Sequence, residues 1–183
     1  MPSFDSAPQV EAKGNEHWIE HLNNGSRVLI RPIRPEDCER EADFIRNLSP
    51  QSRRFRFLGA VKEVSPALLD KLLQADYSKR MAFIALVYEN GKLLEVGVSR
   101  YAATQENCQC ECSVTVADAW QHLGLGTALM KHLIETARQN GFRQMYSVDS
   151  AANTHLQALL QGLGFHRTRD PEDATQVIHR LEL

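Results

Sequence analysis

Val114 to Gly141 read VTVADAWQHLGLGTALMKHLIETARQNG, and this segment combines the end of a strand, a glycine-containing turn and a helix. The β-branched, alternating residues from Val114 to Ala117 predict the strand. After the turn, apolar residues recur at helical spacing, and Asn140-Gly141 predicts the end of the helix. Gly124 and Gly126 therefore lie where a helix begins.

The start of this helix has the properties of an anion-binding site. The first backbone N–H groups of a helix have no acceptor within the helix, and the helix dipole is positive at this end. Glycine lets a bulky anion approach the backbone because it has no Cβ. A phosphate or diphosphate is the natural ligand. Two glycines alone also fit an ordinary helix start without a ligand.

Two familiar phosphate-binding motifs differ from this segment. A P-loop has a Lys-Ser/Thr pair after its last glycine, where this chain has Thr127-Ala128. A dinucleotide-binding fingerprint has a third small residue where this chain has Leu129, and its glycines follow the strand directly. Asp149 does lie where the ribose-binding acid of that fingerprint would fall, so a dinucleotide stays an alternative.

Four motifs in order resemble the GNAT acetyltransferase superfamily, over about residues 28–183. The pattern Gln-x-x-Gly-x-Gly at residues 121–126 resembles its acyl-CoA-binding segment, and Glu111 precedes that glutamine by ten residues. Asn153 follows the next expected strand, and Gly164-Phe165 closes the following helix. This order resembles the branch that includes bacterial protein-lysine acetyltransferases.

Residues 48–57, LSPQSRRFRF, resemble the LSP-x-S-R-x-x-R-F stretch of the same branch. In GNAT folds this region forms one wall of the acceptor site. The resemblance therefore implies a primary amine as acceptor, a protein lysine first and a small-molecule amine as the alternative. The arginines of this stretch also fit a solvated or internally paired surface.

We expect a mixed α/β fold. The patterning predicts antiparallel strands at Met81–Tyr88, Leu93–Ala103 and Cys108–Ala117, with Arg143–Val148 parallel to the last of these. The resemblance implies the GNAT fold. This fold has a central mixed, mostly antiparallel sheet of six or seven strands, about four helices on both faces, and two splayed parallel strands at the cofactor site.

Length and composition indicate one globular domain with a short extension. The chain has 183 residues, of which 43% are hydrophobic and 24% charged. We expect a tail at residues 1–25 and a GNAT domain at 26–183. Within the tail, Asn15 to Leu22 predicts a short helix. Its Trp18 would dock on its own domain or, as the alternative, on a second subunit.

Net charge and hydropathy give no support for nucleic-acid or membrane partners. The net charge of -2 gives no support for non-specific nucleic-acid binding. The longest apolar run, Met81–Tyr88, is too short to span a bilayer, and the polar start of the chain does not resemble a secretory signal. We therefore expect a cytoplasmic protein without nucleic-acid or membrane partners, and a homodimer stays open.

The resemblance implies acetyl-CoA as the acyl donor. Its diphosphate would meet the backbone N–H groups of Gln121, His122, Leu123, Gly124, Leu125, Gly126 and Thr127. Its pantetheine arm would lie between the splayed strands and pair with backbone groups of Val114, Thr115 and Val116. The N–H of Val116 would face the thioester oxygen. Asn153 would hydrogen-bond the arm, although it also fits a plain helix N-cap.

Glu111 matches the glutamate that acts as general base in the protein-acetylating branch. A lysine amine has a pKa of ~10.4, so only about one in 10³ molecules is uncharged at pH 7, and a base must take the proton. Glu111 also fits an ordinary strand surface, and the other candidate bases are Asp118, Asp149 and His122. Many GNAT enzymes have a general-acid tyrosine at the position of Leu160, which this chain lacks.

Cys108, Cys110 and Cys112 alternate along one expected strand and would share a face. Zinc sites usually combine two separated Cys/His pairs, and no second pair partners these cysteines. We therefore expect buried packing and no metal.

The alternative from another functional class, in place of an enzyme, is a non-catalytic module that binds or senses acetyl-CoA.

Overall fold

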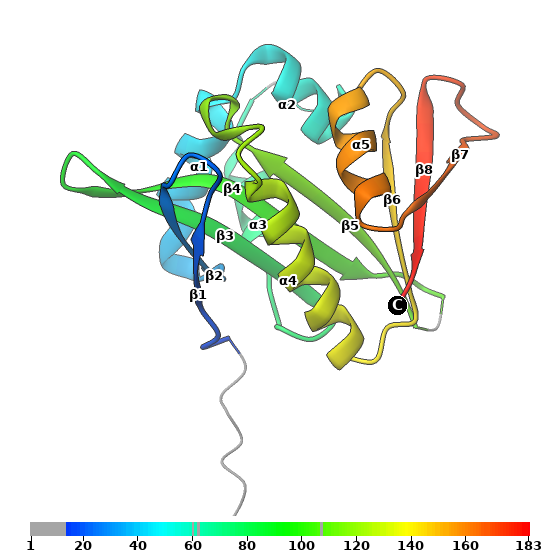
Figure 1. The fold of residues 1–183 in the computed structure, drawn as a ribbon, viewed down its shortest axis with the longest axis horizontal. Helices are drawn as coiled ribbons and strands as arrows, with labels where there is room; N and C mark the ends of the chain where they lie inside the picture. Colours follow the sequence, from blue (N-terminus) through cyan, green and yellow to red (C-terminus); the bar gives the residue numbers. More distant parts are fainter. Residues whose placement is uncertain (1–13, 60, 62, 107) are drawn as a thin grey trace, which may run out of the picture.

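The computed structural model describes residues 14–59, 61, 63–106 and 108–183. At its centre lies an eight-stranded sheet with the order β1-β2-β3-β4-β5-β6-β8-β7 (Figure 1). The strands are β1 Trp18–His21, β2 Arg27–Pro32, β3 Arg80–Glu89, β4 Lys92–Ala103, β5 Gln109–Val116, β6 Gln144–Ser150, β7 His166–Arg169 and β8 Gln176–Glu182. Neighbouring strands are antiparallel except β5 and β6, which are parallel. The expected mixed, mostly antiparallel sheet is confirmed, with one strand more than predicted.

Five α-helices flank this sheet among the described residues. They are α1 Cys38–Asn47, α2 Pro50–Phe57, α3 Pro66–Leu73, α4 Leu125–Gln139 and α5 Thr154–Gly162, with short 3-10 turns η1 Pro35–Asp37 and η2 Asp118–Trp120. Ser49 and Ser65 cap α2 and α3, because their side chains accept hydrogen bonds from backbone N–H groups three residues later. In the part of the chain described here, no helix is both long and apolar enough to cross a membrane.

The sheet is covered on both faces, and β3 shows this most clearly. Met81, Phe83 and Ala85 belong to the core on the α4 side, whereas Ile84 and Leu86 belong to a second core formed with α1 and α3. Successive strand residues point to opposite faces. A strand buried on both faces therefore reads as a nearly continuous apolar run, as β3 does.

The helix predicted at Asn15–Leu22 is wrong, because Trp18–His21 form β1. β1 pairs antiparallel with β2, so the sheet begins ahead of the boundary expected at residue 26. Trp18 meets Phe83 edge-on, with ring centroids 5.3 Å apart, and stacks on His132 of α4 at 4.0 Å. Cross-strand pairing and this packing outweigh the weak helical pattern of this short segment. The expected tail before residue 14 lies outside the described residues.

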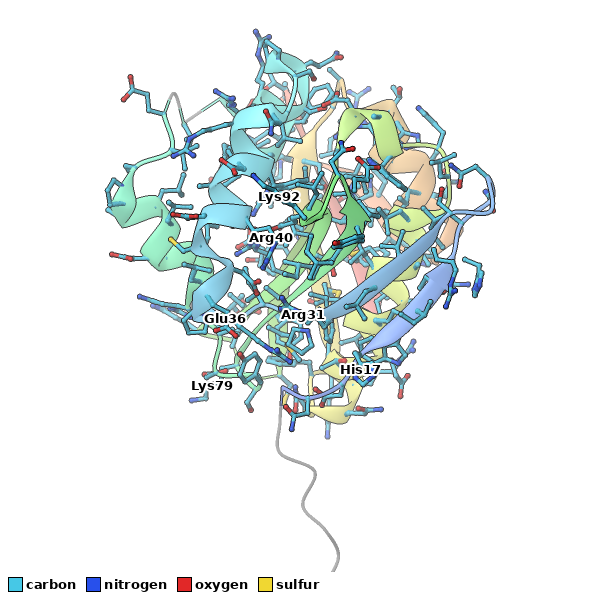
Figure 2. All side chains as sticks on the ribbon, turned by 90° about the vertical axis from the view of Figure 1, so that its left-hand side faces the viewer. His17, Arg31, Glu36, Arg40, Lys79 and Lys92 are labelled. Carbon is cyan, nitrogen blue, oxygen red and sulfur yellow. The ribbon has the colours of Figure 1, made fainter. Side chains whose placement is uncertain are left out.

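A buried ion-pair cluster fixes α1 against the sheet. The fully buried Asp37 accepts two hydrogen bonds from the guanidinium of Arg31, at 2.7 and 2.8 Å, and also binds Arg40. Figure 2 shows Arg31 and Arg40 on the same side of the molecule. The buried carboxylate of Asp37 in η1 therefore compensates the positive charges of Arg31 in β2 and Arg40 in α1.

The parallel strands β5 and β6 pair only at their beginnings. The register runs from Gln109 opposite Gln144 to Glu111 opposite Tyr146 and then stops. β5 continues along β4 to Val116, whereas β6 continues along β8 to Ser150. The two strands therefore diverge, which confirms the expected splay and opens the sheet between them.

The three cysteines at the start of β5 do not share one face as predicted. Cys110 and Cys112 are buried in the core, but Cys108 is exposed. Cys108 precedes the strand and has a left-handed backbone with φ 62°. The strand alternation therefore begins one residue later than the sequence pattern suggested.

Candidate functional site

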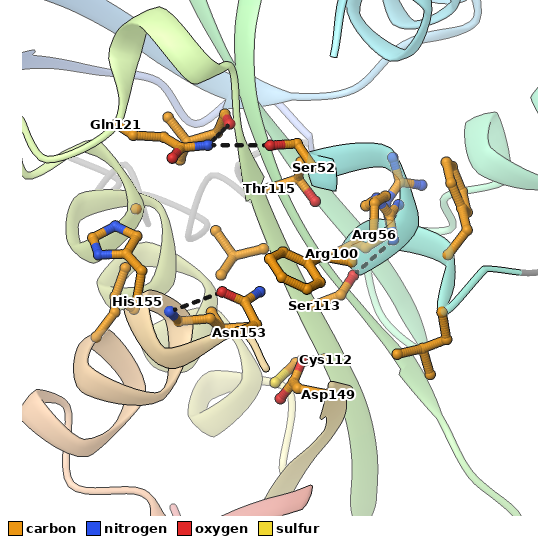
Figure 3. A pocket seen from close by; sticks show the side chains of 18 of the residues that line it. Ser52, Arg56, Arg100, Cys112, Ser113, Thr115, Gln121, Asp149, Asn153 and His155 are labelled. Carbon is orange, nitrogen blue, oxygen red and sulfur yellow. Dashed lines mark hydrogen bonds between the residues drawn. The ribbon is translucent and has the colours of Figure 1, made fainter. Parts of the chain in front are cut away.

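A cleft of about 830 Å³ opens where β5 and β6 separate. It is lined by residues of α2, of β5, of the turn before α4 and of the start of α5 (Figure 3). The predicted site residues that line it are Glu111, Val114, Thr115, Val116, Gln121, His122, Gly124, Gly126, Thr127 and Asn153. Leu125 lies instead in the apolar core, and Leu123 packs against that core.

The turn before α4 presents backbone N–H groups at the mouth of this cleft. Gly124 is the N-cap of α4 and has φ +90°, a conformation that favours glycine. The first intrahelical bond runs from the N–H of Ala128 to the carbonyl of Gly124. The N–H groups of residues 125–127 therefore have no acceptor within the helix, as an anion site requires.

The hairpin between β1 and β2 supports this turn from behind. The backbone N–H of Asn23 donates to the carbonyl of Leu123 at 3.0 Å. The side chain of Asn23 would lie 3.6 Å from a Cβ placed on Gly124. The strand that the sequence missed thus helps to hold the predicted anion-binding backbone.

Gly126 lets α4 and α5 approach each other at the cleft. A Cβ on Gly126 would lie only 2.6 Å from Cδ1 of Leu159 and 3.6 Å from Val116. The absent side chain leaves the first turn of α4 close to the end of β5. This cradle and the exposed N–H groups beside it fit a diphosphate.

Strand alternation determines which backbone groups of β5 face the gap. The N–H of Ala117 donates to Val96 of β4, and Thr115 lies opposite Val98 in the same register. Hydrogen-bonded pairs alternate along an antiparallel ladder, so Val114 and Val116 turn their backbone groups away from β4. They are therefore better placed than Thr115 to pair with a ligand arm between the strands.

Gln121 and Asn153 fix the two ends of this gap. The amide nitrogen of Gln121 donates to the carbonyl of Val116 at 3.1 Å and to the hydroxyl of Ser52 at 3.5 Å. The side-chain oxygen of Asn153 accepts from the N–H of Leu156 at 3.2 Å, so this residue caps α5. The cap occupies the oxygen of Asn153 and leaves its amide nitrogen as a donor for a ligand.

Glu111 lies at the point where the strands separate. Its side chain is exposed to the cleft, and the hydroxyl of Tyr146 donates to its Oε2 over a long 3.4 Å. Burial, followed by the negative charge of Glu111, raises the pKa of Tyr146. Glu111 is thus an accessible carboxylate with one weak hydrogen bond.

The other carboxylates considered as bases are more strongly held. Asp118 accepts from the N–H and hydroxyl of Ser49 and from the hydroxyl of Ser52, at 2.8–2.9 Å. Burial opposes the shift, but these hydrogen bonds lower the pKa of Asp118. Asp149 is buried and accepts from Ser147 at 2.7 Å, and its carboxylate lies 2.9 Å from Nδ1 of His179. Both carboxylates therefore have several or shorter hydrogen bonds, whereas Glu111 has one long bond from Tyr146.

The α2 wall of the cleft carries arginines. The sequence left open whether these side chains are free at the surface or paired within the protein. Arg56 donates to the hydroxyl of Ser113 at 3.3 Å and lies over the ring of Phe57 at 5.0 Å. Burial, followed by the nearby Arg100, lowers the pKa of Arg56 to about 10. Arg100 itself pairs with the buried Glu41 at 2.7 Å. These arginines are therefore partly paired within the protein.

Sequence reasoning missed several residues at this cleft. Arg100, Ser113 and His155 line it, yet no local motif marks them. Leu160, at the position where the resemblance implied a general-acid tyrosine in many GNAT enzymes, is 1% exposed and belongs to the core, so this position supplies no acid. Within the described ranges, no group of three or more His, Cys, Asp and Glu side chains is arranged to hold a metal ion.

Comparisons with known proteins agree with this geometry. A sequence model described as "Acetyltransferase (GNAT) family" matches residues 45–165. The acetyltransferase PA5475 of Pseudomonas aeruginosa is 62% identical over 168 residues, which cover 92% of this chain and 90% of that protein. The acetyltransferase Pat of Mycolicibacterium smegmatis is 26% identical over 144 residues, which cover 78% of this chain but only 42% of Pat.

Among solved structures, the GNAT domain of S. lividans PAT superposes with a TM-score of 0.82. Its sequence is 24% identical, and the match covers 91% of this chain and 97% of that domain. At this level of identity the likeness concerns the fold.

Proposed function

Because the chain belongs to the GNAT acetyltransferase family, we propose that it transfers the acetyl group of acetyl-CoA directly to a primary amine within a ternary complex. One observation carries this proposal. The divergence of β5 and β6 joins an anion-binding turn to an accessible carboxylate, Glu111, in a single cleft. Donor and acceptor would meet there without a covalent enzyme intermediate.

Acetyl-CoA, when bound, supplies the activated acetyl group, and the protein supplies position and charge. The N–H groups at the start of α4 hold the diphosphate, and Asn153 with the backbone of Val114 holds the pantetheine arm. The N–H of Val116 stabilises the negative charge that develops on the carbonyl oxygen. A donor placed at such an oxygen contributes roughly 3–4 kcal/mol to catalysis.

Glu111 is the proposed general base. It takes the proton of the incoming ammonium group, directly or through a water molecule, so that the amine can attack. Since Leu160 replaces the tyrosine of other enzymes, the thiolate would leave without an acid from that position. A thiol pKa of ~8.5 makes thiolate a tolerable leaving group near neutral pH.

We propose a protein lysine as the acceptor. The support is the LSPQSRRFRF segment, which forms α2 and contributes Ser52, Phe55 and Arg56 to the wall of the cleft. A small-molecule amine is the second candidate, because the cleft is wide and lined by both polar and apolar side chains. A non-catalytic acetyl-CoA sensor is the rival from another class.

Two linked measurements test the function. Acceptor amines and proteins are screened for thiol release from acetyl-CoA, and Glu111→Gln is compared with the wild type. We expect the variant to lose about 10²–10⁴-fold in kcat and to keep its affinity for CoA. The matched control is Glu89→Gln, at an exposed carboxylate at the end of β3.

Two results would contradict this assignment in different ways. Unchanged turnover in Glu111→Gln removes Glu111 as the base. A wild-type protein that binds CoA, but releases no thiol with any acceptor, favours the sensor over the enzyme. Mass spectrometry of cellular proteins with and without the enzyme then separates lysine acetylation from small-molecule acetylation.

A further inference from the structure

Two histidines meet at the mouth of the cleft. His122 belongs to the turn before α4, and His155 lies in the first turn of α5. Their ring centroids are 4.0 Å apart, both residues are exposed, and both line the cleft. Figure 3 shows His155 on the same side of the cleft as Gln121 and Asn153.

The surroundings of this pair favour an anion. The free N–H groups at the start of α4 begin three residues after His122, and the first turn of α5 carries His155. The cleft is lined by three carboxylates, and each has another partner: Glu111 binds Tyr146, Asp118 binds Ser49 and Ser52, and Asp149 binds Ser147 and His179. The other basic side chains lining it are Arg56, Lys71, Arg80 and Arg100.

The two imidazoles are too close for both to be charged easily. Burial, followed by the nearby His122, lowers the pKa of His155 below its ordinary value of 6.5. In the free protein His155 is therefore mostly neutral at pH 7. A diphosphate between the rings and the helix start would reverse this balance, because an opposite charge within a few ångströms favours the charged form.

We propose that His122 and His155 together bind the diphosphate of acetyl-CoA and take up a proton from solvent when it binds. This inference rests on the proposed function and extends it from backbone N–H groups to side chains. The proton adds to the neutral imidazole nitrogen and gives an imidazolium. No other bond changes.

The sign of the pH dependence follows from linkage. The bound form holds the proton more tightly than the free form, so affinity rises as the pH falls through the imidazole pKa of the complex. It levels off below the lower pKa of the free protein. Each proton taken up changes the affinity by at most about tenfold per pH unit.

Isothermal titration calorimetry measures how many protons the protein takes up when the ligand binds. Dephospho-CoA is the probe, because it lacks the 3′-phosphate, which itself titrates near pH ~6. Titrations at pH 7 in buffers of different ionisation enthalpy give the number of protons taken up. We expect a net uptake by the wild type, and binding about tenfold tighter at pH 6 than at pH 8.

The variants are chosen to preserve the backbone. His122→Asn suits the left-handed conformation of His122, with φ +61°, and His155→Gln keeps a polar helical side chain. The double variant should bind without proton uptake and with little pH dependence. His166→Gln, at an exposed residue of β7, should behave as the wild type.

The outcomes separate the inference from the function on which it rests. Equal proton uptake in wild type and double variant overturns the role of the histidines, as does a wild-type affinity that is the same at pH 6 and pH 8. In either case acetyl transfer itself still stands. If neither CoA nor dephospho-CoA binds the wild type at any pH, the proposed function fails together with the inference.

Discussion

Asp37 illustrates how a single buried charge is made stable in this molecule. Its carboxylate accepts two hydrogen bonds from Arg31 and one from the N–H of Arg34, and it also binds Arg40. Burial alone would raise the pKa of Asp37, but the hydrogen bond from Arg31 and then that from the Arg34 backbone lower it. The folded protein therefore favours the ionised form.

Asp37→Asn should lower the free energy of unfolding at pH 7 by about 3 kcal/mol, because it leaves two guanidinium groups without their buried partner. The contribution of Asp37 is complete above the unfolded pKa of about 3.9 and is lost as the pH falls through the lower folded value. The difference between wild type and variant should therefore shrink below about pH 4. Urea unfolding at pH 7 and pH 3 measures it.

The control for this prediction lies on α1, the helix that begins directly after Asp37. Asp43 pairs with Arg46 at 3.1 Å, but the two side chains are 70% and 57% exposed. Asp43→Asn should therefore change the stability by less than about 1 kcal/mol. Equal losses for the two variants would mean that burial of Asp37 does not determine its contribution.

At the scale of elements, the long, regular segments were predictable and the short ones were not. α4 carries clear helical periodicity over many residues and β3 is a long apolar run, and Ser49 and Ser65 cap their helices. β1 has only four residues, so local preference could not outweigh its pairing with β2. The residues after β1, Asn23-Asn24-Gly25, form a hairpin turn, and the N–H of Asn23 donates to the carbonyl of Leu123 in the turn before α4.

The contact between α4 and α5 tests the role of Gly126. Gly126→Ala should cost less than about 1 kcal/mol, because Cδ1 of Leu159 is the end of a flexible side chain and can turn away. Gly126→Leu should separate the two helices and weaken CoA binding by at least about tenfold. Equilibrium binding and thermal unfolding of both variants distinguish a local clash from general unfolding.

Leu159→Ala provides the matched partner for this test. Combined with Gly126→Ala, it should remove the cost of the new Cβ, so that the double variant is as stable as Leu159→Ala alone. An unchanged dissociation constant for CoA in Gly126→Leu would show that close approach at this position is not needed for binding.

At the scale of the whole molecule, the site combines a local motif with distant partners. The turn at residues 121–127 is continuous in sequence, so its glycines could be recognised directly. The pairs that shape the rest of the cleft join residues far apart in the chain, such as Asp149 with His179, 30 residues away, and Glu41 with Arg100, 59 residues away. Such pairs have no sequence spacing of their own and follow only from the topology of the sheet.

The same topology predicts how a ligand stabilises the fold. β5 remains attached to β4 and β6 to β8, and the strand pairing between the two parts of the sheet covers three register positions, Gln109–Glu111 with Gln144–Tyr146. A ligand that bridges the gap binds only the folded state. At 100 times its dissociation constant, CoA should stabilise this state by about 2.7 kcal/mol, which raises Tm by about 5–10 °C in a chain of this size.

Two variants test whether the thermal shift depends on CoA binding or on the proposed base. Glu111→Gln should retain the full shift, because the proposed base contributes to proton transfer and not to CoA binding. Gly126→Leu should lose about half of the shift or more at the same CoA concentration, because binding at least about tenfold weaker lowers the stabilisation from about 2.7 to about 1.4 kcal/mol. Scanning calorimetry with and without CoA gives both values. A wild-type Tm that does not respond to saturating CoA would mean that no ligand bridges the parted strands, and the cleft would then need another occupant.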